Sequence, residues 1–108
     1  MTEAELDTLL EKMSRLAEMF ERAASGGYPS GRYAAEAIQR RRDDLVHRVR
    51  GSDALVIASR LLDIVPTAKD LDAIGFDLRR HPEIRAMLGE TDILAAEFSG
   101  AYLGEGDE

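Results

Sequence analysis

The sequence predicts an all-α protein, a compact single-domain helical bundle of about five to six helices. Apolar residues recur at helical spacing along most of the chain, and no run alternates with the period of a strand. Glycine, proline and capping residues separate the apolar runs into segments of helical length. The chain has 108 residues, 44% hydrophobic and 32% charged, which is typical of one globular domain. We expect that domain to span residues 1–104 and residues 105–108 to form a flexible acidic tail.

The first helix is expected over residues 2–24. Thr2 and Glu5 have the spacing of a capping box, and Ser25-Gly26-Gly27 supplies a residue able to adopt positive φ at the end. One narrow stripe follows the helical period: Leu6, Leu9, Leu10, Met13, Leu16, Ala17, Phe20 and Ala24. A stripe this narrow packs either against the chain's own helices or against a second copy, so a homodimer is left open.

Two further helices are expected in the middle of the chain. The second covers residues 31–50 and stops at Gly51, and Ser52 caps a third over residues 53–65 that Pro66 ends. The third segment is apolar around most of its circumference, which is typical of the central helix in a bundle.

The last third of the sequence predicts three shorter helices. Thr67 and Asp70 resemble a capping box for a helix over 68–80, whose apolar stripe is Leu71, Ile74 and Leu78. A first-turn proline and a C-terminal glycine bound a fifth helix over 82–88. Thr91 or Asp92 then caps a sixth helix over 92–103.

Basic and acidic residues are unevenly distributed along the chain. Residues 26–50 carry six arginines and three acidic residues, a net of +3, whereas the whole chain has a net charge of −7. The helix over 31–50 could therefore meet a partner, a second copy or a phosphate backbone, with Arg40, Arg41 and Arg48 beside Tyr33 on its polar side. Because proteins that bind nucleic acid are usually basic as a whole, we favour a solvated face or a protein contact.

Two charged residues fall on apolar sides of their helices. Arg42 lies between apolar positions of the second helix, where it extends to water, pairs between helices or meets another chain. Glu97 lies on the apolar side of the sixth helix, and a lone buried carboxylate is costly. We therefore expect an ion pair of Glu97 with Arg42 or Arg60.

The loop between the first two helices has the glycine spacing of a phosphate-binding loop. It lacks the lysine and the Ser/Thr of that motif, with Arg32 and Tyr33 in their place, so we reject a phosphate loop. Tyr28 either folds onto the bundle or serves as an interface anchor. Phe76 falls off the stripe of its predicted helix, and together with Met19 and Tyr102 it could form an exposed apolar patch.

The residues needed for common chemistries are scarce. The chain has no cysteine and two histidines, and His81 before Pro82 is typical of a helix end. We expect no metal, no cofactor, no catalytic residues and no enzyme activity. No signal peptide or membrane span is apparent, which predicts a cytoplasmic protein without a membrane contact.

These observations favour a small acidic, non-enzymatic protein that binds a larger protein partner. Inhibitors, antitoxin-like or immunity-like proteins and phage anti-defence proteins are such proteins, and an acidic surface would attract a basic site on the target. That surface would include Asp63, Asp70, Asp72, Asp77, Glu83, Glu90 and Asp92. The alternative is a small helical subunit of a nucleic-acid-containing complex, with the 31–50 helix as its contact. The candidate partner-binding residues are Tyr28, Arg32, Tyr33, Arg40, Arg41, Arg48, Asp70, Asp72, Phe76 and Asp77.

Overall fold

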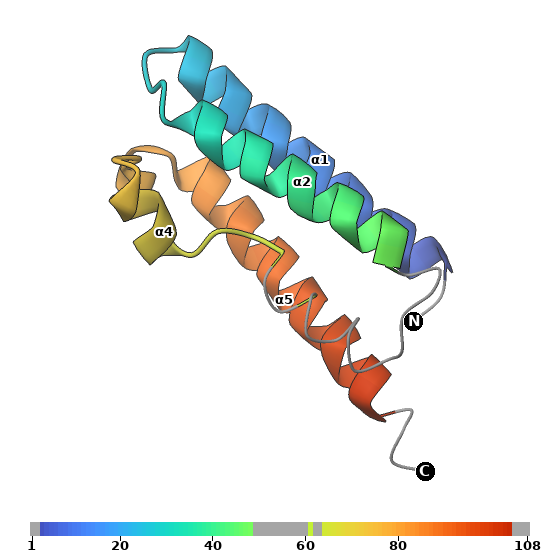
Figure 1. Cartoon of the computed structure of the whole chain (residues 1–108). Helices are drawn as coiled ribbons and strands as arrows, with labels where there is room; N and C mark the ends of the chain where they lie inside the picture. The colour runs from blue at the N-terminus through green and yellow to red at the C-terminus, as the bar shows by residue number, and fades with distance from the viewer. Residues whose placement is uncertain (1–2, 49–60, 62–63, 105–108) are drawn as a thin grey trace.

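Two long antiparallel helices and a third that runs beside them make up most of the described structure (Figure 1). The computed structural model describes residues 3–48, 61 and 64–104. Helix α1 spans Glu3–Ser25, α2 spans Gly31–Arg48 and α5 spans Pro82–Gly104. Between them lie the short α4, Ala68–Ala73, and a 3-10 turn, η1, Leu78–Arg80. The described residues contain no strand, so the all-α prediction is confirmed. They form four α-helices, so the predicted number of five to six is not confirmed.

Helix α1 forms as its stripe predicted. The stripe residues from Leu9 to Phe20 are buried, while the opposite side is charged and carries the Glu11–Arg15 pair at 3.5 Å. Gly27 has a φ of 109° just after the helix, where the Tyr28 amide donates to the Ala23 carbonyl at 3.0 Å. This left-handed glycine reverses the chain and starts α2 antiparallel to α1.

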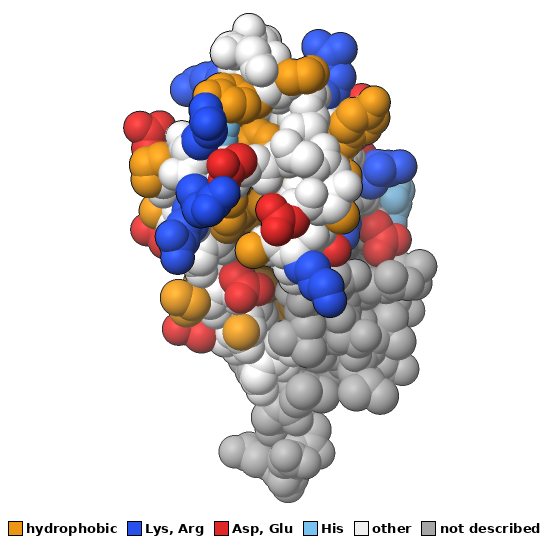
Figure 2. Space-filling view, turned by 90° about the vertical axis from the view of Figure 1, so that its left-hand side faces the viewer, with side chains coloured by type: hydrophobic (Ala, Val, Ile, Leu, Met, Phe, Trp, Pro, Cys, Tyr) orange, Lys and Arg blue, Asp and Glu red, His pale blue; other side chains and the backbone are white. Residues whose placement is uncertain are grey.

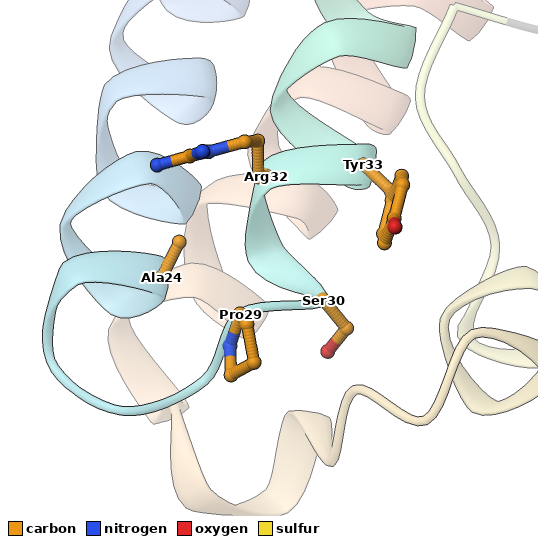
Figure 3. A pocket seen from close by; sticks show the side chains of 5 residues that line it. All are labelled: Ala24, Pro29, Ser30, Arg32 and Tyr33. Carbon is orange, nitrogen blue, oxygen red and sulfur yellow. The ribbon is translucent and has the colours of Figure 1, made fainter.

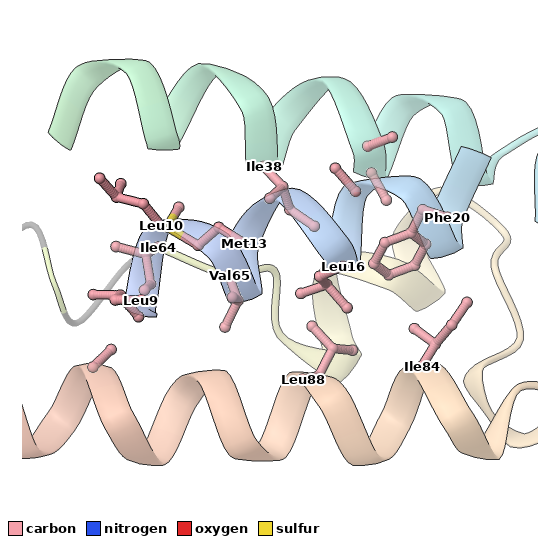
Figure 4. Close-up of a cluster of buried hydrophobic side chains, with 14 of the residues drawn as sticks. Leu9, Leu10, Met13, Leu16, Phe20, Ile38, Ile64, Val65, Ile84 and Leu88 are labelled. Carbon is pink, nitrogen blue, oxygen red and sulfur yellow. The ribbon is translucent and has the colours of Figure 1, made fainter. Parts of the chain in front are cut away.

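Figure 4 shows the core that joins the three long helices. It takes Leu9, Leu10, Met13, Leu16 and Phe20 from α1, Ile38 from α2, Ile64 and Val65 from the segment before α4, and Ile84 and Leu88 from α5. Most of the predicted third helix, 53–60 and 62–63, lies outside the described residues, as do Thr2, Gly51 and Ser52. Ile64 and Val65 are buried but lie in a bend rather than in a helix.

The predicted helix over 68–80 is wrong beyond Ala73. The Thr67–Asp70 capping box forms as expected, but Gly75 adopts a φ of 79°. The Phe76 amide donates to the Leu71 carbonyl at 2.9 Å and the Gly75 amide donates to Asp72 at 3.0 Å, which is a Schellman motif. The motif ends α4 and directs Phe76 into the core.

The predicted break between residues 88 and 92 is also wrong, because α5 continues through Gly89. A buried row extends on both sides of that glycine: Ile84, Leu88, Thr91, Ala95 and Phe98. Thr91 does not cap a new helix, since its hydroxyl donates to the Met87 carbonyl at 2.8 Å. A glycine inside a helix costs about 1 kcal/mol, less than the burial of one large apolar side chain contributes.

Candidate functional site

A shallow hollow of about 490 Å³ lies where the α1–α2 loop enters α2 (Figure 3). We call it the hairpin tip, and its lining residues are Ala24, Pro29, Ser30, Arg32 and Tyr33. Figure 3 shows the Arg32 side chain extended toward α1 and the Tyr33 ring on the other side of the first turn of α2. Tyr33 is 66% exposed, the largest exposed fraction among the described large hydrophobic residues.

Close packing of Gly31 holds the hairpin tip in place. A Cβ atom on Gly31 would lie 2.5 Å from the Phe20 carbonyl oxygen, so glycine is needed where α2 starts against α1. Three backbone hydrogen bonds fix the same turn: Gly31 to Tyr28 at 2.9 Å, Arg32 to Pro29 at 3.2 Å, and Tyr33 to Ser30 at 3.1 Å. The backbone at Arg32 and Tyr33 is therefore held in one conformation by contacts within the protein.

Tyr28 lies on the inner side of the loop. Its half-buried ring packs edge-to-face on His81, with 4.5 Å between the ring centroids, and His81 stacks on Phe76 at 4.7 Å. The His81 Nε2 atom is buried and has no hydrogen-bond partner among the described residues. Of the two readings of Tyr28, the structure therefore favours the ring folded onto the bundle.

Phe76 is a core residue. Its side chain is 1% exposed and packs edge-to-face against Phe20, with 5.1 Å between the ring centroids. Phe76 therefore does not contribute to an exposed apolar patch, because the Schellman turn at Gly75 changes the direction of the residue that follows it. Met19 is half-buried against the same core, and the Tyr102 side chain lies outside the described part.

The arginines of α2 do not share one face. Arg32 and Arg40 are exposed, with the acidic Glu36 and Asp43 also exposed beside them. Arg40 lines a second hollow of about 370 Å³ with Glu21, Glu36 and Gln39. The described exposed side of α2 therefore carries as many acidic residues as arginines.

Two other arginines of α2 are half-buried. The Arg42 Nε atom donates to the Leu10 carbonyl at 3.2 Å, so this residue joins α2 to α1. The Arg41 Nη1 atom is buried without a hydrogen-bond partner among the described residues. Glu97 is exposed, so the predicted Arg42–Glu97 pair is wrong, and the side chains of Arg48 and Arg60 lie outside the described residues.

Two of the candidate acidic residues stabilise local turns. Asp70 accepts a hydrogen bond from the Thr67 amide at 3.0 Å, and this bond, with smaller contributions from the charges of Arg41 and Lys69, lowers the pKa of the Asp70 carboxyl. Asp77 accepts from the Arg79 Nε at 3.1 Å and lies 3.7 Å from the Arg80 Nε, and the bond to Arg79 lowers the pKa of the Asp77 carboxyl. Asp72 is exposed.

The structure brings some candidate residues together and separates others. Arg32 and Tyr33 share the hairpin tip with Ala24, Pro29 and Ser30, which were not among the candidate residues. Within the described ranges, no three His, Asp or Glu side chains are placed to bind a metal ion together. None of the described helices has the length and apolar character of a membrane span.

No protein-family model, curated protein or solved structure matches this chain.

Proposed function

We propose that this chain is a non-enzymatic helical protein that binds a larger protein partner, and that the hairpin tip contacts that partner. One observation carries the proposal: Tyr33 is 66% exposed beside an apolar hollow, on backbone fixed by the Gly31 contact. Tyrosine and arginine are enriched among the residues that dominate protein interfaces. An inhibitor, an antitoxin-like or immunity-like protein and a phage anti-defence protein are the classes that fit this mode of action.

A preformed tip favours binding because little order is lost when the partner arrives. The Tyr33 ring has few rotatable bonds, and its backbone is held by hydrogen bonds within the turn. Removing the ring from water contributes about 1.5–3 kcal/mol, which corresponds to roughly 10- to 100-fold in affinity. Tyr33 is therefore the side chain whose loss should weaken binding most.

The geometry supports a protein partner better than a nucleic acid. A phosphate backbone requires a concentration of positive charge, and the described exposed side of α2 carries Glu36 and Asp43 as well as Arg32 and Arg40. Arg41 and Arg42 are half-buried, and Arg42 is already bonded to α1. A subunit of a nucleic-acid-containing complex is the second hypothesis, and the following experiment separates the two.

The test places a photo-crosslinking amino acid at position 33 and, as a control, at the exposed position 74, which does not line the hairpin tip. Extracts of the source cells are irradiated with and without nuclease treatment. We expect one protein to be crosslinked from position 33, not from position 74, and to survive nuclease. Purified partner should then bind Y33A at least tenfold more weakly than I74A, with both variants giving the wild-type circular dichroism spectrum.

Two outcomes would overturn the proposal. Capture that disappears with nuclease would assign the contact to a nucleic-acid complex. Equal affinities of Y33A and I74A for the purified partner would place the binding surface away from the hairpin tip.

A further inference from the structure

The side of α5 that faces away from the core carries a second row of residues at helix-packing spacing. The row is Pro82, Ala86, Gly89, Ile93, Ala96 and Gly100, spaced alternately four and three residues apart, and every member is exposed. Ile93, near its centre, is 63% exposed. The row lies opposite the buried one that begins at Ile84, so α5 has the pattern of a helix packed on two sides.

Helix α1 shows what an ordinary solvent-facing side looks like in this fold. Its exposed side carries mostly charged residues: Glu5, Asp7, Glu11, Arg15, Glu18, Glu21 and Arg22. The outward row of α5 has no charged residue, although both helices span 23 residues. An exposed isoleucine in an uncharged row is therefore a feature of α5 and not of the surface in general.

The charged residues that flank this row indicate the charge of a partner that would bind there. Glu83, Glu90 and Glu97 follow one another at intervals of seven residues, which places them along one edge at flanking positions of a helix pair. Lys12 lies 3.8 Å from Glu90, and Glu83 and Glu97 have no ion-pair partner among the described residues. On the opposite edge, Arg85 and Asp92 cancel each other's charge.

Figure 2 shows the side of the molecule that lies on the left in Figure 1. Most Lys and Arg side chains in that view lie in its upper half. The described surface below them shows acidic and hydrophobic side chains.

We propose that the outward side of α5 binds a basic amphipathic helix of a protein partner, one with small or apolar residues along its seam and lysine or arginine on the edge that meets the three glutamates. A second copy of this chain fits less well. In an antiparallel symmetric pair the glutamate edge would face itself. In a parallel pair it would face the edge where Arg85 and Asp92 cancel. This surface is separate from the hairpin tip, and the inference does not rest on the function proposed for that tip.

The probe is a synthetic helical peptide of about three heptads with Leu and Ala along its seam and Lys at the flanking positions, compared with the same peptide carrying Glu. Binding is followed by fluorescence anisotropy, with size exclusion and light scattering of the protein alone. The first variant, I93D, is compared with I74D, which adds the same charge at the exposed Ile74. The second, E83K/E90K/E97K, is compared with D7K/E18K/E21K, an equal change of charge on exposed positions of α1.

We expect the Lys peptide to bind the wild type and I74D, and to bind I93D at least tenfold more weakly. The E83K/E90K/E97K variant should lose the Lys peptide and bind the Glu peptide, while D7K/E18K/E21K keeps the wild-type preference. I93D makes the protein more acidic, so general attraction of a basic peptide would predict equal or tighter binding to this variant.

Three results would overturn the inference. The first is equal binding to I93D and I74D, which would mean general attraction without a seam. The second is failure of the Lys peptide to bind the wild type. The third is a dimer of the protein alone that I93D dissociates, which would assign the surface to a second copy.

Discussion

Replacing Gly31 by alanine should destabilise the fold, although alanine is the better helix former. The new Cβ atom would lie 2.5 Å from the Phe20 carbonyl oxygen, about 0.9 Å inside the 3.4 Å at which ordinary contact begins. It would also lie 3.3 Å from the Ala24 amide nitrogen. Both are backbone atoms of α1, so no side-chain rotation relieves the contact and the two helices must separate at the hairpin tip.

The size of the effect follows from two opposing terms. Overpacking of this kind costs about 1–3 kcal/mol. The gain in helix propensity from glycine to alanine is at most about 1 kcal/mol, and it is smaller at Gly31, the first residue of α2. We therefore expect G31A to lose about 1–2 kcal/mol, which lowers the Tm by about 4–8 °C for each kcal/mol.

Gly89 supplies a matched control for the same substitution. It lies inside α5, and a Cβ atom there would meet nothing within 4 Å. G89A should gain about 0.5–1 kcal/mol from helix propensity alone. Urea and thermal unfolding followed by circular dichroism at 222 nm, a wavelength set by the α-helical signal, measures both variants under one protocol. A G31A variant as stable as the wild type, or a G89A variant destabilised as much as G31A, would refute this reasoning.

Three further substitutions test other contacts. F76A should lower the free energy of unfolding in urea by about 3–5 kcal/mol because the ring is fully buried. A loss below about 1 kcal/mol would contradict the burial of this residue. R42M keeps an apolar stem but removes the donor to the α1 backbone, and it should cost about 0.5–1.5 kcal/mol, whereas a stabilised variant would mean that the bond contributes nothing. The lowered pKa values of Asp70 and Asp77 predict stability that is fully present above about pH 4 and is lost as the pH falls through the folded-state pKa values. D70N/D77N should therefore lose less stability than the wild type as the pH is lowered from about 5 to about 2, and parallel curves would contradict the assignment.

Helix identity could be predicted where local pattern and burial agree, as in α1. The two later glycines show where sequence alone does not decide. Gly75 ends a helix because Phe76, the residue after it, enters the core, whereas Gly89 does not end one because a buried row continues beyond it. That row contains Thr91 and Ala95, which give only a weak apolar signal, so its continuation depends on packing against α1 and not on local propensity.

The residues of the hairpin tip could be predicted only in part from the sequence. Tyr28 and Tyr33 are five residues apart in similar surroundings, yet one ring packs on His81 and the other is exposed. The difference follows from the contact of Gly31 with the Phe20 carbonyl, which sets the direction of the first turn of α2. Such a contact joins residues in two different helices, and no local pattern encodes it. The glycine itself was the available signal, because glycine is the residue that allows one backbone to approach another closely.

Some arginines of α2 have a structural role that could not be predicted from their positions in the sequence. The Arg42 Nε atom donates to the Leu10 carbonyl of α1. Part of the positive charge of α2 therefore acts between elements of this fold, and its exposed part is balanced by Glu36 and Asp43. The exposed side of α2 therefore has little net positive charge with which to bind a phosphate backbone. Tyr33 and the outward row of α5, in contrast, are exposed and are not covered by any element of the described structure. A binding role therefore rests on the exposed apolar residues more firmly than on the arginines that first suggested it.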